Sequence, residues 1–444
     1  MTFLPSTRLL WAVFAVALLA VLAGPLPELA PLWAVALAGV GLWALADLGL
    51  SLRGLALPTV TAPEVVRFTK DRPGALPVTF TVPAGGARRL RFALALPGAW
   101  ESREAEVRVE LPTDAPRARI DWHCTPRRRG RYGDVLACLE TRSRFGAWQL
   151  RVRRPLACEL RVYPNLFTER KQLAALFLAR GQFGVRLRRT VGRGREFEKL
   201  RDYQPGDGFD EIHWKATAKH GRPITKVFQS ERTQEIYVVI DASRLSARAV
   251  TIDGVTTTTL ERYLTAALVL LLAADRQADR FGLVVYDDRV RTFLRAGRGA
   301  GHYAACRDAI HALQPSGATP DVAETTRHLR AGLRQRALLF FLTDLTDPVL
   351  AEDFVRHARL LARQHLVLVN QLRPPGVAPL FTGAEARDDG DLYGRLAGHA
   401  RWAEARALAQ KLRPLGITAT LLENEAMAAQ LVTQYLTVKE RQAL

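Results

Sequence analysis

The sequence predicts three structural parts: an N-terminal transmembrane helical hairpin, an antiparallel β-sandwich domain and a C-terminal doubly wound α/β domain. Two long apolar runs near the start of the chain predict the hairpin. Short alternating strands separated by Pro and Gly predict the sandwich, and apolar strands alternating with helical segments predict the α/β domain. We place the hairpin at 1–56, the β-domain at 57–164, a connecting region at 165–232 and the α/β domain at 233–444.

The predicted hairpin consists of apolar runs at 9–26 and 32–52, separated by the helix-breaking sequence PLPELAP. The second run reaches the roughly 20 residues that a membrane-spanning helix needs, and the first is slightly short. A cleaved signal peptide would explain the first run, but it would leave the second run unexplained. Asp47, near the end of the second run, is expected at the level of the lipid headgroups, where a charge costs little.

Charges around the hairpin predict its orientation. Its loop carries no Lys or Arg, only Glu28, and Arg8 precedes the first run. Basic residues also follow the second run: Arg53, Arg67, Lys70 and Arg72. The positive-inside rule therefore places both ends of the hairpin in the cytoplasm. We expect a membrane protein with its soluble domains in the cytoplasm.

Composition limits the class of protein. Of the 444 residues, 48% are hydrophobic and 24% charged, as in a folded protein with a membrane segment. The formal net charge of +19 suits an acidic protein partner, anionic lipid or nucleic acid, and does not choose among them. The four cysteines lack metal-ligand spacing, which argues against a structural zinc site and is typical of reduced thiols: Cys124, Cys138, Cys158 and Cys306.

The β-region contains short runs such as LPVTFTVP, RRLRFALALP and WQLRVRRP, which alternate apolar and polar residues. Their spacing of about ten residues predicts a sandwich or barrel. The basic sequence RRRGRYG at 127–133 is interpreted as a solvated hairpin loop rather than a binding patch. From residue 234 onward, continuous apolar strands such as EIYVVIDAS alternate with helical segments, a pattern typical of a parallel sheet covered on both faces.

Common catalytic motifs are missing. The sequence has no Walker A loop, no G-x-S-x-G and no H-E-x-x-H, and GRGREF at 192–197 resembles a dinucleotide loop only in its first two glycines. His213 and His220 lie seven residues apart without a placed carboxylate, so we assign them no catalytic role. We therefore expect no enzyme activity.

Polar residues follow the predicted strands of the α/β domain, where ligands bind in such folds. They come from the sequences DASRLS, SGATPD and LTDLTD: Asp241, Ser243 and Ser246; Thr319 and Asp321; Thr343, Asp344 and Asp347. Hydroxyl and carboxylate oxygens are the ligands that Mg²⁺ prefers, so these loops predict a magnesium site.

This arrangement resembles a von Willebrand factor A domain with its metal-ion-dependent adhesion site. That motif has the form D-x-S-x-S, followed by a threonine and an aspartate. Asp241, Ser243, Thr319 and Asp344 match it, and Leu245 stands where the second serine belongs. The metal site is therefore degenerate. In the alternative interpretation, Ser243 and Asp344 only close loops over the sheet.

The sequence GREFEKLRDYQPGDGFDEIHWKATAKHG, at 194–221, precedes this domain. It resembles the signature of the bacterial family known as domain of unknown function 58, and the membrane hairpin and β-domain are similar to that family's layout. The signature residues are Arg201, Tyr203, Pro205, Gly206, Asp207, Trp214 and Lys215. The resemblance implies partnership with MoxR-type AAA+ ATPases, in which the A-like domain serves as an adaptor.

The signature region also has a structural interpretation. Pro205 and Gly206 suit the centre of a type II turn, and Asp207 is placed to cap a short helix that ends at Gly221. Trp214 is expected to pack between domains rather than stack on bases.

Three functions stay open from the sequence. The leading one is a membrane-anchored protein-interaction adaptor. The second is a metal-dependent hydrolase or nuclease that uses Asp241, Asp321 and Asp344. The third is a nucleic-acid binder, which only the net charge supports, so we expect no nucleic-acid partner.

Overall fold

The computed structural model describes residues 2–23, 25, 30–83, 86–112, 117–179, 191–204, 208–209, 212–229, 234–252, 254–382 and 388–441. The chain divides into two compact units, 1–165 and 166–444. Pro205, Gly206 and Asp207 of the predicted turn lie outside the described residues.

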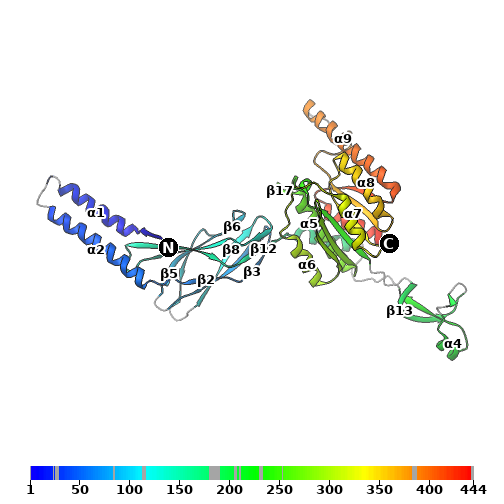
Figure 1. Cartoon of the computed structure of the whole chain (residues 1–444), viewed down its shortest axis with the longest axis horizontal. Coiled ribbons are helices and arrows are strands. Elements are labelled where there is room, and N and C mark those ends of the chain that lie inside the picture. Colours follow the sequence, from blue (N-terminus) through cyan, green and yellow to red (C-terminus); the bar gives the residue numbers. More distant parts are fainter. Residues whose placement is uncertain are drawn as a thin grey trace. The chain divides into compact units, whose positions relative to one another are not determined.

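The first unit begins with two apolar helices, α1 (Thr7–Ala23) and α2 (Ala30–Gly54), which lie side by side (Figure 1). Within the described residues, α2 alone is long and apolar enough to cross a membrane, and α1 is a shorter apolar helix. Most of their large apolar side chains are exposed, so this surface is not covered by the protein itself.

Twelve strands of the first unit form three sheets. The first sheet has the order β1-β11-β10-β5-β7, the second β2-β4-β8-β6 and the third β3-β12-β9. The strands are β1 (Thr2–Pro5), β2 (Thr59–Thr61), β3 (Val65–Thr69), β4 (Gly74–Thr81), β5 (Arg89–Ala95), β6 (Trp100–Ser102), β7 (Val107–Glu110), β8 (Arg117–Pro126), β9 (Gly130–Tyr132), β10 (Val135–Arg142), β11 (Trp148–Leu156) and β12 (Glu159–Tyr163).

Alternate residues of these strands share one hydrophobic core. Phe80 of β4 and Phe92 of β5 meet edge to face with 4.9 Å between ring centroids, although their strands belong to different sheets. The period-two pattern therefore gives the expected burial of one face. Pairing is antiparallel with one exception, since β12 runs parallel to β3. Cys124, buried in this core, has its pKa raised to about 12 by burial, and all four cysteines are free.

The second unit is built on a six-stranded sheet with the order β19-β18-β15-β20-β21-β22. Its strands are β15 (Glu235–Asp241), β18 (Arg280–Tyr286), β19 (Val290–Gly297), β20 (Leu338–Leu342), β21 (Leu366–Leu372) and β22 (Thr418–Leu422). Five strands are parallel, and β19 pairs antiparallel with β18 at the edge. The predicted alternation of strands and helices is confirmed. β19 is an exception to this alternation, because it follows β18 directly after a tight turn.

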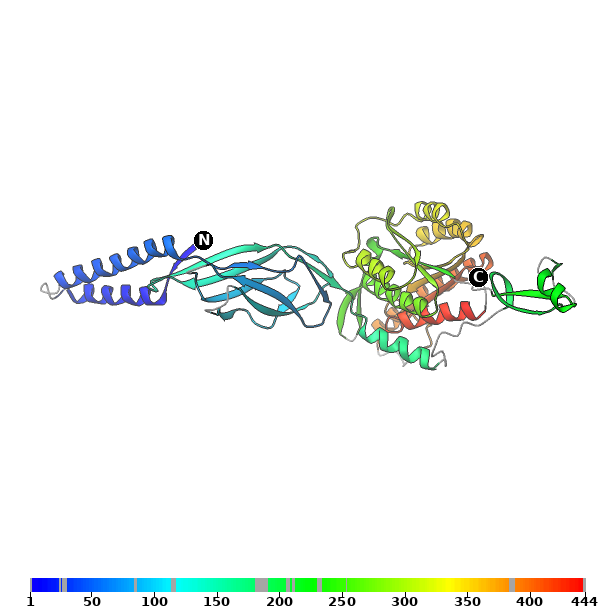
Figure 2. The same ribbon diagram turned by 90° about the horizontal axis from the view of Figure 1, so that it is seen from below.

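Helices cover both faces of this sheet (Figures 1 and 2). One face carries α3 (Phe167–Ala179), α5 (Thr259–Arg276), α6 (Ala300–Ile310) and α10 (Met427–Glu440). The other face carries α7 (Val322–Gly332), α8 (Pro348–Ala362) and α9 (Asp389–Leu412). Continuous burial of the central strands follows from this double cover, because neither face of the sheet meets water.

Further elements complete the second unit: β13 (Val191–Asp202), α4 (Trp214–His220), β14 (Ile224–Gln229), the 3₁₀ turn η3 (Arg244–Ala247), β16 (Ala249–Ile252), β17 (Val255–Thr258) and the 3₁₀ turn η4 (Arg413–Leu415). Asp207, the predicted cap of the signature helix, lies outside the described residues. In the structure α4 starts at Trp214, because the Nδ1 atom of His213 caps it by accepting a hydrogen bond from the Ala216 amide at 3.0 Å. It ends at Gly221, as expected, with a left-handed φ of 67°.

Candidate functional site

The candidate site lies at the carboxyl ends of the central strands, where β15 ends in Asp241. This carboxylate is almost fully buried. Its Oδ1 accepts a hydrogen bond from the Ser243 amide at 2.8 Å, and its Oδ2 accepts one from the Thr343 hydroxyl at 2.9 Å. Burial raises the pKa of Asp241, while the hydrogen bonds from Ser243 and Thr343 oppose that rise. Asp241 thus joins the loops after β15 and β20.

Ser243 is also buried, and its hydroxyl oxygen caps η3 by accepting a hydrogen bond from the Leu245 amide at 3.3 Å. The Ser246 hydroxyl donates to the Ser243 carbonyl at 2.8 Å. The backbone turns into η3 at the position where the metal motif has its second serine. Ser243 therefore helps to close the loop after β15, which is the structural role expected of it if it does not bind a metal ion.

Thr319 and Asp321 come from the loop before α7. The backbone of this loop contacts the β15 loop, since the Arg244 amide donates to the Ala318 carbonyl at 3.0 Å. The Thr319 hydroxyl accepts a hydrogen bond from Nε of Arg244 at 3.4 Å. Asp321 instead caps α7 by accepting from the Glu324 amide at 2.8 Å. The structure therefore brings Thr319 to the loop that carries Asp241 and Ser243, and it uses Asp321 for a helix cap.

Asp344 follows β20, and its two oxygens have different partners. Oδ1 accepts hydrogen bonds from the amide and the hydroxyl of Thr346, the amide at 3.0 Å. Oδ2 forms an ion pair with Arg248, which follows η3. The nearby Asp347 caps α8, where Pro348 occupies the first turn. A guanidinium thus holds the carboxylate that the metal motif would offer to a cation.

The hydrogen bonds and the ion pair of Asp241 and Asp344 affect whether these carboxylates can bind Mg²⁺. Both oxygens of Asp241 and both of Asp344 already have partners. Across the described part of the chain, no group of three or more His, Cys, Asp or Glu residues is placed to hold a metal ion. Asp344 would hold Mg²⁺ only after Arg248 left its carboxylate, so metal binding stays a prediction.

Asp287, which the sequence reasoning did not single out, lies in the same region at the end of β18. Both of its oxygens accept hydrogen bonds from Nε of Arg291 at 2.8 Å. Burial alone would raise the pKa of Asp287, but the hydrogen bonds, led by that of Arg291, lower it to about 2. Its position at the end of a buried strand next to β15 was the signal available in the sequence.

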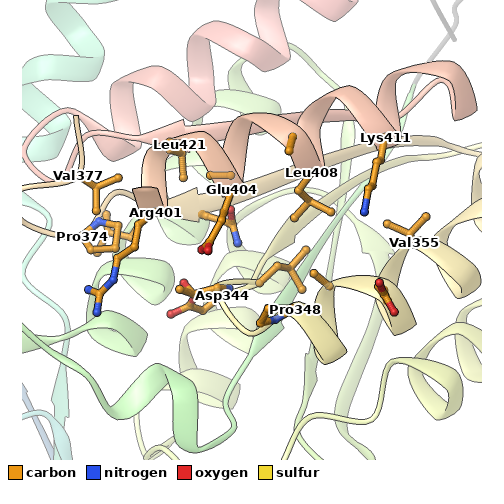
Figure 3. Close-up of a pocket in the computed structure, with 18 residues that line it drawn as sticks. Asp344, Pro348, Val355, Pro374, Val377, Arg401, Glu404, Leu408, Lys411 and Leu421 are labelled. Carbon is orange, nitrogen blue, oxygen red and sulfur yellow. The ribbon is translucent and has the colours of Figure 1, made fainter. Parts of the chain in front are cut away.

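A cavity of about 400 Å³ opens beside Asp344, between α8 and α9 (Figure 3). Its lining is mostly apolar and includes Leu345, Pro348, Val355, Leu372, Val377 and Leu408. Charged side chains also line it: Asp344, Glu352, Arg401, Glu404 and Lys411. Sequence reasoning missed this cavity, because α9 was recognised only as a covering helix.

The signature residues take several positions. The Arg201 guanidinium donates to the Asp202 carbonyl at 3.1 Å, and the Tyr203 amide donates to the Pro223 carbonyl at 3.0 Å. Lys215 is exposed, and Trp214 exposes 68% of its surface, so Trp214 does not pack as predicted. The signature shapes a strand pair and a short helix, and none of its described residues lines the cavity.

A second buried carboxylate lies in the first unit. Asp47 of α2 accepts hydrogen bonds from the amides of Phe145 and Ala147, each at 2.8 Å, and from the Ser143 hydroxyl. The indole of Trp148 donates to the Ala44 carbonyl at 2.8 Å. Asp47 was expected to meet the headgroups, but it is fully buried because the turn between β10 and β11 encloses it.

Comparison with known proteins supports the resemblance read from the sequence. Residues 199–379 match the model of a family described as protein of unknown function DUF58. Uncharacterized proteins of Mycobacterium tuberculosis and Mycobacterium bovis are 26% identical over 188 residues, which is 41% of this chain and 56% of each relative. The chain thus spans little more than half the length of these curated relatives.

Several solved structures are similar to a little less than half of this chain. The conserved hypothetical protein BatB from Bacteroides thetaiotaomicron is 18% identical, with a TM-score of 0.30, over 46% of this chain and 99% of that one. An aerotolerance-related membrane protein from Bacteroides fragilis is 18% identical, with a TM-score of 0.29, over 45% of this chain and 99% of that one. The SpRpn10 VWA domain is 12% identical, with a TM-score of 0.29, over 46% and 95%.

Proposed function

From the match of residues 199–379 to the model of the DUF58 family, we propose that this chain is a membrane-anchored protein-interaction adaptor. It works with a MoxR-type AAA+ ATPase in the assembly or maturation of a client protein. The ATPase partnership is what the resemblance of the sequence to this family implies. The cavity beside Asp344 is the observation that carries the interaction role, because it places an open apolar surface with a charged rim at the ligand-binding edge of the sheet.

The anchor in this proposal is a transmembrane hairpin of α1 and α2, followed by a sandwich-like β-domain. With 25 residues, α2 is about 37 Å long, which exceeds the roughly 30 Å of a bilayer's hydrocarbon core. The 17 residues of α1 give about 25 Å, so α1 crosses only with its flanking residues or in a thinned bilayer. Basic residues before and after the pair support an orientation with the soluble parts in the cytoplasm, at the inner membrane.

Asp47 supports an adaptor that is attached firmly to its anchor. Its hydrogen bonds hold the β10–β11 turn against α2, so the β-domain does not hang from the membrane on a free linker. A fixed attachment of this kind sets the position of the β-domain relative to the proposed membrane anchor.

Affinity capture from native membranes after in-cell cross-linking tests the proposal. We expect the tagged full-length chain to recover a MoxR-type AAA+ ATPase together with a client, in excess over an unrelated tagged inner-membrane protein. Reciprocal capture with the tagged ATPase should recover this chain. If the chain recovers neither an ATPase nor any protein beyond that control, the adaptor role is wrong.

A further inference from the structure

We propose that the groove formed by the cavity and the adjoining face of α9 binds an amphipathic helix of a partner protein. Apolar side chains of that helix fill the cavity, and its carboxylates pair with Arg401 and Lys411. This inference rests on the proposed adaptor function and deepens it by naming the kind of segment that docks.

The cavity offers room and an apolar lining. Its volume of about 400 Å³ lies in the range of sites that enclose a small ligand or the anchoring side chains of a peptide. Leu372, at the end of β21, contributes to its lining, and Val355 and Leu408 contribute from α8 and α9. Burying apolar side chains against such a lining supplies the main attraction in helix-in-groove recognition.

The apolar surface extends beyond the cavity, which favours a helix over a small molecule. Tyr393, Glu404 and Lys411 lie eleven and seven residues apart, close to whole turns of α9, so they share one face. Tyr393 is 70% exposed, so this face stays open to solvent beyond the cavity. From Tyr393 to Lys411 this face measures about 27 Å, a length that suits a docked helix of about 18 residues.

Charges around the groove specify the partner further. Figure 3 shows Arg401 and Lys411 toward opposite ends of the cavity, with Glu404 between them. Of the residues that the structure describes, none forms an ion pair or hydrogen bond with these three or with Glu352. Asp344, by contrast, is neutralised by Arg248. A complementary helix carries an acidic residue, a basic residue and a second acidic residue in that order, and the net charge of +19 favours an acidic partner.

The groove is preformed on the α9 side. A Cβ atom on Gly398 would lie 2.0 Å from the Gly376 carbonyl oxygen, so α9 sits directly on the backbone of that loop. Leu408 and Leu412 are buried and fix the C-terminal half of the same helix in the core. A rigid wall reduces the entropy lost on docking.

The test uses the full chain in detergent and designed fluorescent helices of about 20 residues. One probe has an apolar face with the acidic–basic–acidic pattern, and the second has every charge reversed. By fluorescence anisotropy, we expect the wild type to bind the first probe about tenfold more tightly than the second. Arg401→Glu combined with Lys411→Glu should invert this preference, because both changed residues are exposed and face the probe.

Two further variants complete the test. Ala405→Trp fills the cavity and should weaken the binding of both probes by about tenfold. Arg406→Glu reverses one charge on α9 at a residue that does not line the cavity, and it should alter the binding of neither probe. Equal binding of the two probes by the wild type, or an unchanged preference in the Arg401/Lys411 double variant, overturns the proposal. The proposal is also wrong if the wild type forms a dimer and Ala405→Trp dissociates that dimer, since the groove would then hold a second copy of this chain.

The membrane capture separates this inference from the proposed function. If Ala405→Trp and the Arg401/Lys411 double variant still recover the same partners as the wild type, the adaptor function stands and the groove is not its docking site. If the probes bind as expected but the wild type captures no ATPase, the groove binds helices as proposed and the ATPase partnership is wrong.

Discussion

Asp47 of α2 and Ser143 of the β10–β11 turn form a buried hydrogen bond between residues 96 positions apart. The same carboxylate accepts from the amides of Phe145 and Ala147. A single side chain of the proposed membrane anchor therefore satisfies three donors of the β-domain. Each of these donors is left without its partner when the carboxylate is removed.

We predict that Asp47→Ala destabilises the first unit by about 3–5 kcal/mol, because an unsatisfied buried donor costs roughly 1–3 kcal/mol. Thermal unfolding of the full chain in detergent measures the loss, and hydrogen exchange should become faster at Phe145 and Ala147. Asp121→Asn is a matched control, since Asp121 pairs only with Arg119 on the surface, and it should shift stability by less than about 0.5 kcal/mol. Equal stability of Asp47→Ala and wild type would show that α2 does not hold the turn.

Sequence patterns anticipated the broad architecture because that architecture follows from local periodicity. Alternation predicted the strands of the β-region, and continuous apolar runs predicted the buried strands of the second unit. The role of Asp47 was inaccessible, because its partners lie about a hundred residues away and no local pattern records them. Arg248 was missed for a similar reason. From the sequence alone an arginine at this position is expected to be solvated, and only the folded chain places it next to Asp344.

The Arg248–Asp344 ion pair gives a test of the predicted Mg²⁺ site. We predict that Arg248→Ala strengthens binding of Mg²⁺ by about tenfold, because it removes a positive charge that competes for the same carboxylate. Asp344→Asn combined with Arg248→Ala should abolish that gain. Isothermal titration of the full chain with Mg²⁺ measures both. Tight Mg²⁺ binding by the wild type that Arg248→Ala leaves unchanged would mean that the ion does not use Asp344.

The lowered pKa of Asp287 predicts how stability depends on pH. Its pKa is about 2 in the folded chain against a usual value of 3.8, so the unfolded chain binds more protons between these values. Its contribution of about 2 kcal/mol is therefore complete above about pH 4 and is lost as the pH falls toward about 2. Asp287→Asn lacks this contribution at neutral pH.

Urea unfolding of the full chain, followed by circular dichroism, measures the prediction for Asp287. The stability difference between wild type and Asp287→Asn should shrink as the pH falls from about 7 to about 2. Asp121→Asn, at an exposed carboxylate that pairs with Arg119 on the surface, should show little difference at any pH. A difference for Asp287→Asn that stays constant over this range would show that folding does not lower the pKa of Asp287.

Two glycines of α9 give opposite predictions for the same substitution. At Gly398, an added methyl group would collide with the Gly376 carbonyl oxygen, a backbone atom that cannot move aside cheaply. At Gly394, one turn earlier, nothing lies within 4 Å of the added atom. We predict that Gly398→Ala destabilises the second unit by about 1–3 kcal/mol through the forced displacement of α9. Gly394→Ala should instead stabilise it by about 0.5–1 kcal/mol, because alanine favours the helix.

Stability and docking should separate in this pair of variants. Displacing α9 also moves Arg401 and Glu404, which lie within two turns of Gly398, so Gly398→Ala should weaken binding of the acidic–basic–acidic probe. Gly394→Ala leaves the cavity lining in place and should bind that probe like the wild type. Thermal unfolding and probe anisotropy on the same samples measure both effects. If Gly398→Ala loses stability but keeps full probe binding, the seating of α9 on the Gly376 loop does not shape the groove.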